Sequence, residues 1–228
     1  VGEDCTLCDS STVIKVSGDD FQDLVSSCYD DASDCPEDVP IGCWDTSEVT
    51  DMASAFYEIE SFDDSINCWN TARVTDMNNM FYYATNFNQP LDDWNVASVT
   101  DMATMFSLAT AFNQPLNDWN VASVTHMGTM FNIATEFNQP LDDWNVASVN
   151  DMREMFNYES NFNQPLDDWN VASVTDMEFM FLLAIHFNQL LNKWNVASVN
   201  NMRLMFGRTT NFNQPLDDWN VASVTDMA

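Results

Sequence analysis

Large apolar side chains recur along this sequence with a period of 25 residues. All eight tryptophans keep this spacing, at Trp44, Trp69, Trp94, Trp119, Trp144, Trp169, Trp194 and Trp219. The 14 methionines fall in two columns of the same repeat. A fixed period of this length is typical of repeat proteins, in which each unit buries its apolar face only by stacking on its neighbours. We therefore expect the tryptophans to form a structural core ladder.

The first half of a unit alternates between apolar and polar residues. Residues 91–99 read L-x-x-W-x-V-x-x-V, and Trp94 and Val96 alternate with Asp93 and Asn95. Alternation with a period of two predicts a short strand with one buried face. In this strand the tryptophan and the valine face inward, and the polar residues face outward.

The second half of the unit has a longer period. Met102, Met105, Phe106 and Ala109 occupy positions i, i+3, i+4 and i+7, which predicts the buried face of a short helix. Thr100 precedes them and is a competent N-cap for that helix. At this spacing we interpret the methionine columns as core rather than as a soft binding groove.

Together these patterns predict an α/β solenoid of about eight coils of 25 residues. Each coil contains a short parallel β-strand and a short helix, and the strands form one continuous sheet. The repeats occupy residues 41–228, and the last repeat is incomplete. Residues 1–40 lack the repeat and are predicted to form an N-terminal cap, with an amphipathic helix at residues 19–31.

The unit resembles a known repeat family. L-x-x-W-x-V-x-x-V is similar to the leucine-rich-repeat strand pattern L-x-x-L-x-L-x-x-N. The longer string FNQPLDDWNVASVTDM, followed by x-x-M-F, resembles the BspA-like surface proteins, which also occur as mycoplasma-type lipoproteins. The resemblance covers residues 41–228. It implies a leucine-rich-repeat-like solenoid on a cell surface that serves adhesion or protein binding, and it carries over no catalytic residues.

The six cysteines all lie in the first third of the chain, at Cys5, Cys8, Cys28, Cys35, Cys43 and Cys68. An even number clustered at one end predicts a disulfide-stapled cap, and with it an extracellular or cell-surface location. The alternative is zinc, because Cys5-x-x-Cys8 has ligand spacing, but the second half of a zinc knuckle is missing. The pairing stays open: Cys43 and Cys68 occupy equivalent positions of adjacent coils and bond either each other or the cap. The chain starts at Val1, as expected after removal of a signal peptide or for a fragment.

The charge balance is strongly acidic. The chain has 36 acidic and 6 basic residues, for a net charge of −30. Such a surface repels nucleic acid and anionic membranes and favours basic or polar partners. No stretch approaches the ~20 apolar residues that span a bilayer. The sequence therefore predicts neither nucleic-acid binding nor a membrane span.

The outward face of the predicted strands carries a ladder of carboxylates, at Asp93, Asp118, Asp143, Asp168 and Asp218. Two interpretations are open. The ladder is either a solvated acidic face, or a site where calcium or a basic partner bridges the carboxylates, since calcium prefers oxygen ligands. The calcium signal is weak because neither an EF-hand loop nor a calcium-binding β-helix repeat is present.

No pattern in the sequence indicates catalysis. We find no nucleophile–base motif, phosphate loop or metalloprotease motif. His126 and His186 lie in different units without a partner and are interpreted as surface substitutions. We therefore expect no enzyme activity and no cofactor other than calcium.

The leading functional hypothesis is an extracellular structural or adhesive repeat protein that self-associates head-to-tail into a filament or surface fibre. The alternative is a monomeric surface receptor or adhesin that binds protein or glycan ligands through its acidic strand face. A selective binding face usually varies from unit to unit, whereas Asp-x-Asn-x-Ala repeats almost unchanged here, which favours the structural hypothesis. A third class, ice binding, needs a threonine ladder that the predicted strand face lacks.

Overall fold

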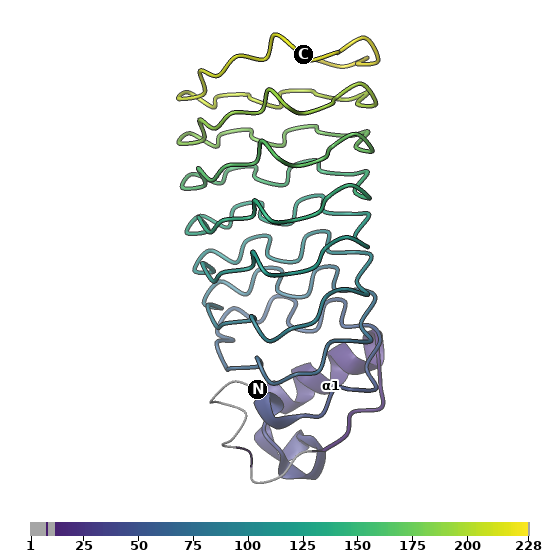
Figure 1. Ribbon diagram of the computed structural model, residues 1–228. Helices are drawn as coiled ribbons and strands as arrows, with labels where there is room; N and C mark the ends of the chain where they lie inside the picture. The colour runs from purple at the N-terminus through teal and green to yellow at the C-terminus, as the bar shows by residue number, and fades with distance from the viewer. Residues whose placement is uncertain (1–7, 9–11, 228) are drawn as a thin grey trace.

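The computed structural model describes Cys8 and residues 12–227, and it shows a column of stacked coils above a small helical end (Figure 1). The one α-helix of the described chain is α1 (Asp19–Asp30), at the segment for which the sequence predicts an amphipathic helix. Three short 3-10 helices follow it, at Ala32–Asp34, Pro36–Asp38 and Ile41–Cys43. Residues 41–227, which we call the coil stack, then wind through successive coils of 25 residues.

The expected α/β solenoid, with a β-strand and a helix in each coil, is wrong. No residue between 12 and 227 belongs to a strand, and no helix occurs after Cys43 in that range. Sheet-like pairing is limited to isolated parallel bridges between neighbouring coils, such as those of Asp101 with Asp76 and with His126.

Each coil is instead a sequence of tight turns. In one coil the N–H of the fourth turn residue donates to the carbonyl of the first in the turns 91–94, 96–99, 102–105, 106–109 and 109–112, at 3.0–3.3 Å. The first and last residue of each turn are apolar and buried, whereas most residues between them are partly or fully exposed. The pattern L-x-x-W therefore marks a turn rather than a strand.

The predicted helix fails for a conformational reason. Thr104 and Leu108 both have φ of +63°, and each is the third residue of its turn, as in a type II β-turn. Two successive four-residue turns place apolar residues nearly as a helix does, so the sequence pattern does not distinguish them. The N–H groups of Thr104, Phe106 and Leu108 point out of the coil and donate to carbonyls of the next coil at 2.8–2.9 Å.

Three columns of aromatic rings run through the interior of the coil stack. The indoles lie parallel, as in Trp69 and Trp94, whose ring centroids are 6.4 Å apart with planes inclined by 2°. Phe81 and Phe106 stack at 5.4 Å in the second column, and Phe106 contacts Phe112 of the third at 4.1 Å. Offset parallel stacking at these distances is favourable beyond the burial of apolar area.

Each indole also has a fixed hydrogen-bond partner. Nε1 of Trp119 donates to the carbonyl of Leu91 in the preceding coil at 3.1 Å, and the same bond recurs at every tryptophan from Trp69 to Trp219. A buried tryptophan therefore leaves no unpaired donor. Burial of one such ring contributes at most about 4–6 kcal/mol, because it removes roughly 150–250 Å² from water.

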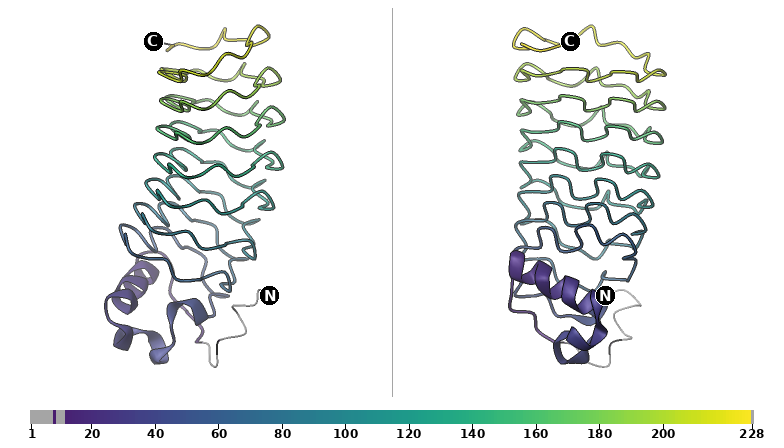
Figure 2. Two further views of the ribbon diagram at one scale, coloured as in Figure 1. Left: turned by 90° about the vertical axis from the view of Figure 1, so that its left-hand side faces the viewer. Right: turned by 180° about the vertical axis from the view of Figure 1, so that it is seen from behind.

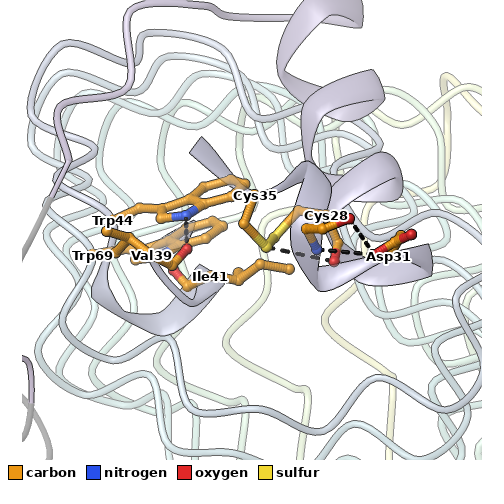
Figure 3. The surroundings of a disulfide bond; sticks show 8 residues. Cys28, Asp31, Cys35, Val39, Ile41, Trp44 and Trp69 are labelled. Carbon is orange, nitrogen blue, oxygen red and sulfur yellow. Dashed lines mark hydrogen bonds between the residues drawn. A yellow bond between two sulfur atoms is a disulfide. The ribbon is translucent and has the colours of Figure 1, made fainter. Parts of the chain in front are cut away.

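Helix α1 covers the first coil (Figure 2). Its buried side includes Phe21, which packs edge-on against Trp69 at 5.6 Å and Trp44 at 6.3 Å between ring centroids. The disulfide Cys28–Cys35 joins the helix to the following loop, and Trp44 lies beside it (Figure 3). The end of the aromatic column is thus closed by helix α1 and a covalent link.

Replacement of an indole in the middle of the stack should be far more costly than replacement at its end. Trp144 is 3% exposed, so Trp144→Ala is expected to lower the free energy of unfolding by about 3–5 kcal/mol. Trp219 is only partly buried, and Trp219→Ala is expected to cost clearly less. Urea unfolding followed by circular dichroism measures both. Equal losses at the two positions would contradict the shared core.

The left-handed turn positions distinguish these turns from a helix. Tyr158 has φ of +54° and is 50% exposed, so Tyr158→Gly should leave stability unchanged or raise it. Tyr158→Val should lower it by about 1 kcal/mol or more, because a β-branched residue is strained in that conformation. Thermal melts give the order of the two variants. In a helix the order would be reversed, since glycine is the poorer helix former.

Candidate functional site

The predicted carboxylate ladder, Asp93, Asp118, Asp143, Asp168 and Asp218, lies exposed along one side of the coil stack. Several of its members already have polar neighbours. Asn117 Nδ2 donates to Asp143 Oδ2 at 2.6 Å, and Lys193 Nζ lies 2.8 Å from Asp168 Oδ1. Among the described residues, no group of three or more His, Cys, Asp and Glu side chains is placed to hold a metal ion. Calcium at this ladder stays a prediction.

A second acidic column directly follows the threonines that were expected to cap helices. Asp101 Oδ1 accepts the N–H of Ala103 at 2.9 Å, so the carboxylate closes a local turn. Burial raises the pKa of Asp76, and the negative charges of Asp101 and Asp51 add to this against the opposing N–H of Asn78. The regular Asp after each threonine was the signal for this column.

The histidines do not form a site with each other. His126 replaces aspartate in the second acidic column, and its Nδ1 lies 3.9 Å from Asp101 Oδ2. His186 lies in another coil, where its Nδ1 contacts the carbonyl of Ser160. Both side chains are exposed.

The threonines expected to cap helices have a different role. Thr100 Oγ1 donates to the carbonyl of Thr75 in the preceding coil at 3.1 Å, and Thr125 repeats this bond with Thr100. Ser98 Oγ likewise donates to the carbonyl of Ala72 at 3.0 Å. These hydroxyls therefore join neighbouring coils instead of capping the N-termini of helices.

An asparagine column with the same regularity was not recognised as a site from the sequence. Asn113 Oδ1 accepts the backbone N–H of Asn138 and the side-chain Nε2 of Gln139, both at 3.0 Å, from the next coil. The same pair of bonds is made by Asn88, Asn138, Asn163 and Asn188. The recurring F-N-Q-P string was the available signal for this column.

The cysteines confirm the predicted disulfides at the described positions. Cys8 bonds Cys43, and Cys28 bonds Cys35. Cys68 is disulfide-bonded as well, and the alternative pair Cys43–Cys68 is wrong. Cys5 lies outside the described residues, and Cys8 is not a thiolate ligand for zinc. Disulfides of this kind fit an oxidising, extracellular compartment. None of the described helices is long and apolar enough to cross a bilayer.

Glu159 places a carboxyl group in the interior. It occupies a column that holds alanine at Ala134 and Ala184, and its side chain is 0% exposed. Oε1 accepts the N–H of Asn161 at 3.2 Å, whereas Oε2 has no hydrogen-bond partner in the described structure. Desolvation raises the pKa of this carboxyl to about 9, against the hydrogen bonds that lower it. The group is therefore protonated at neutral pH.

This carboxyl predicts a pH dependence of stability. Because the folded-state pKa is raised from 4.5 to about 9, the folded state holds a proton that the unfolded state has lost between these values. The contribution of Glu159 to stability is thus greatest below pH 4.5 and falls as the pH rises towards 9.

Glu159→Ala should raise the urea midpoint and flatten its decline over that range, and urea titrations at several pH values measure this. Glu48 is exposed, so Glu48→Ala should keep the wild-type decline. If Glu159→Ala and Glu48→Ala declined in parallel, the buried acid would not be the cause.

Comparison with known proteins adds one finding. A family described as Mycoplasma protein of unknown function, DUF285, matches twice, over residues 24–144 and 127–228. Comparison with curated proteins and with solved structures finds no match. The family match agrees with the mycoplasma-type part of the resemblance drawn from the sequence, and it does not extend to the leucine-rich-repeat part. Because the two matches together run from residue 24 to residue 228, the chain belongs to this family of mycoplasma-type repeat proteins.

Proposed function

We propose that this protein is a non-enzymatic extracellular scaffold, with a structural or adhesive role. The observation that carries the proposal is the repetition of the same inter-coil bonds from coil to coil. The indole bond, the threonine bond and the asparagine bonds each recur along the coil stack with almost the same distances. Repetition of this kind lengthens the coil stack by equal steps, and it creates no single position with a chemistry of its own.

The coil stack is built to be stiff along its axis. Each coil up to the one that contains Leu183 donates four backbone N–H groups to the next one, as Met102, Thr104, Phe106 and Leu108 do. The aromatic columns fill the interior between them without a change of register. A stiff rod with a uniform surface suits a spacer or fibre better than a selective receptor.

The disulfides support the extracellular part of the proposal. Cys8–Cys43 closes a separation of 35 residues between the cap region and the first coil. Such links persist in oxidising compartments and are rare where thiols are kept reduced. They also stabilise the end of the stack, typically by about 2–4 kcal/mol each.

Head-to-tail self-association into a filament is part of the proposal. Helix α1 lies at the N-terminal end of the stack, so a neighbour must dock on that helix and its loop rather than on an open coil. The alternative, a receptor that reads protein or glycan ligands with its acidic ladder, has less support because that ladder barely varies along the stack.

Sedimentation velocity and negative-stain electron microscopy of the oxidised protein test this proposal. We expect a frictional ratio of an elongated particle, and rods that lengthen into filaments as the concentration rises. Leu204 lies at the C-terminal end of the stack and is 41% exposed, so Leu204→Glu should keep single rods and abolish filaments. Compact particles would contradict the scaffold proposal, and dispersed rods at every concentration would contradict filament formation.

A further inference from the structure

The asparagine column presents a row of hydrogen-bond donors that the fold does not use. In Asn113, Asn138 and Asn163 the amide oxygen accepts two bonds from the next coil, which fixes the plane of each amide. No hydrogen bond within the described chain involves the Nδ2 group of these three residues. Each NH2 group is therefore held in place, one per coil, with its two protons available to a ligand.

The same surface also carries acceptors. Asn113, Asn138 and Asn163 share a hollow of about 480 Å³ with Glu136, Asn161 and His186. The His186 Nδ1 contacts the carbonyl of Ser160, so Nε2 is the ring nitrogen left to face a ligand. Glu136 is exposed and adds a carboxylate. The hollow thus combines neutral amide donors with a carboxylate acceptor.

This arrangement fits a neutral ligand rich in hydroxyl groups. A hydroxyl group both donates and accepts, so each one can bond an Nδ2 group and a neighbouring acceptor together. The net charge of −30 opposes polyanions, including nucleic acids and acidic glycans. The lining of the hollow holds no tryptophan, tyrosine, phenylalanine or aliphatic side chain, which disfavours a protein partner, because protein interfaces rely on such anchors.

We propose that this hollow, which we call the groove and which is lined by Asn113, Asn138, Asn163, Glu136, Asn161 and His186, binds a neutral polysaccharide. The chain of sugar rings lies along the stack axis and meets one amide per coil. This groove is distinct from the acidic ladder, and it goes beyond the proposed scaffold role, because a rod can form with or without a ligand.

The structure offers a substitution that removes the donors and keeps the stack. Asp63 stands in the first position of the same column, and its Oδ1 accepts the N–H of Asn88 at 2.9 Å as an asparagine would. The triple variant Asn113→Asp, Asn138→Asp, Asn163→Asp therefore retains every inter-coil acceptor and replaces each NH2 donor with an oxygen. It should fold with the wild-type circular dichroism spectrum.

A matched control makes the same change elsewhere. Asn95, Asn120 and Asn145 are exposed, and their Oδ1 atoms accept local N–H groups. Asp45 accepts the equivalent bond at 3.0 Å in the first coil. Asn95→Asp, Asn120→Asp, Asn145→Asp therefore adds the same three negative charges outside the groove.

Affinity electrophoresis in gels containing laminarin, yeast mannan, dextran or galactomannan, with alginate as the polyanion, tests the proposal. We expect at least one neutral polymer to retard the wild type and the control, and the groove variant to bind about tenfold more weakly or not at all. Failure of the wild type to bind any neutral polymer would overturn the proposal. Unchanged binding by the groove variant, or an equal loss of binding in the control, would also overturn it. Neither result would change the expected outcome of the rod and filament measurements.

Discussion

A coil of 25 residues built around tight turns has no interior of its own, and this constraint governs the rest of the molecule. Its tryptophan, methionine and phenylalanine side chains leave water only when another coil lies against them. The indole holds neighbouring coils together in two ways: its ring stacks on the next ring, and its N–H donates to a carbonyl of the preceding coil. That carbonyl also accepts the backbone N–H that closes the turn, so one oxygen joins the turn to the neighbouring coil.

The sequence predicted which residues face inward and which element closes the stack, but not the backbone conformation. Trp94, Val96 and Met102 are buried as expected, and helix α1 begins at the expected residue. The strand and helix were wrong because apolar residues three apart fit a turn as well as either element. The decisive feature, φ of +63° at Thr104 and Leu108, is invisible in the sequence, since neither residue is a usual left-handed one.

For the surface sites too, residue types could be predicted from the sequence, whereas contacts that depend on the fold could not. The acidic ladder and the disulfide cysteines were evident from residue type and spacing alone. The pairing of Cys8 with Cys43, and the bonds from Asn113 to Asn138 and Gln139, depend on how the chain is folded and were not. At one position, a residue that departs from the repeat indicated an unusual group better than the regular columns did. Glu159 stands out in an alanine column, and the structure makes it a buried acid with a pKa of about 9.

Hydrogen exchange at the indole Nε1–H groups, followed by NMR, tests the shared interior most directly. All eight indoles donate to a backbone carbonyl, and those from Trp44 to Trp194 are 2–4% exposed. We expect slow exchange at these seven indoles and faster exchange at Trp219, which is only partly buried. Rapid exchange along the middle of the row, at Trp94 to Trp169, would show that the rings do not share one interior, and would contradict the account.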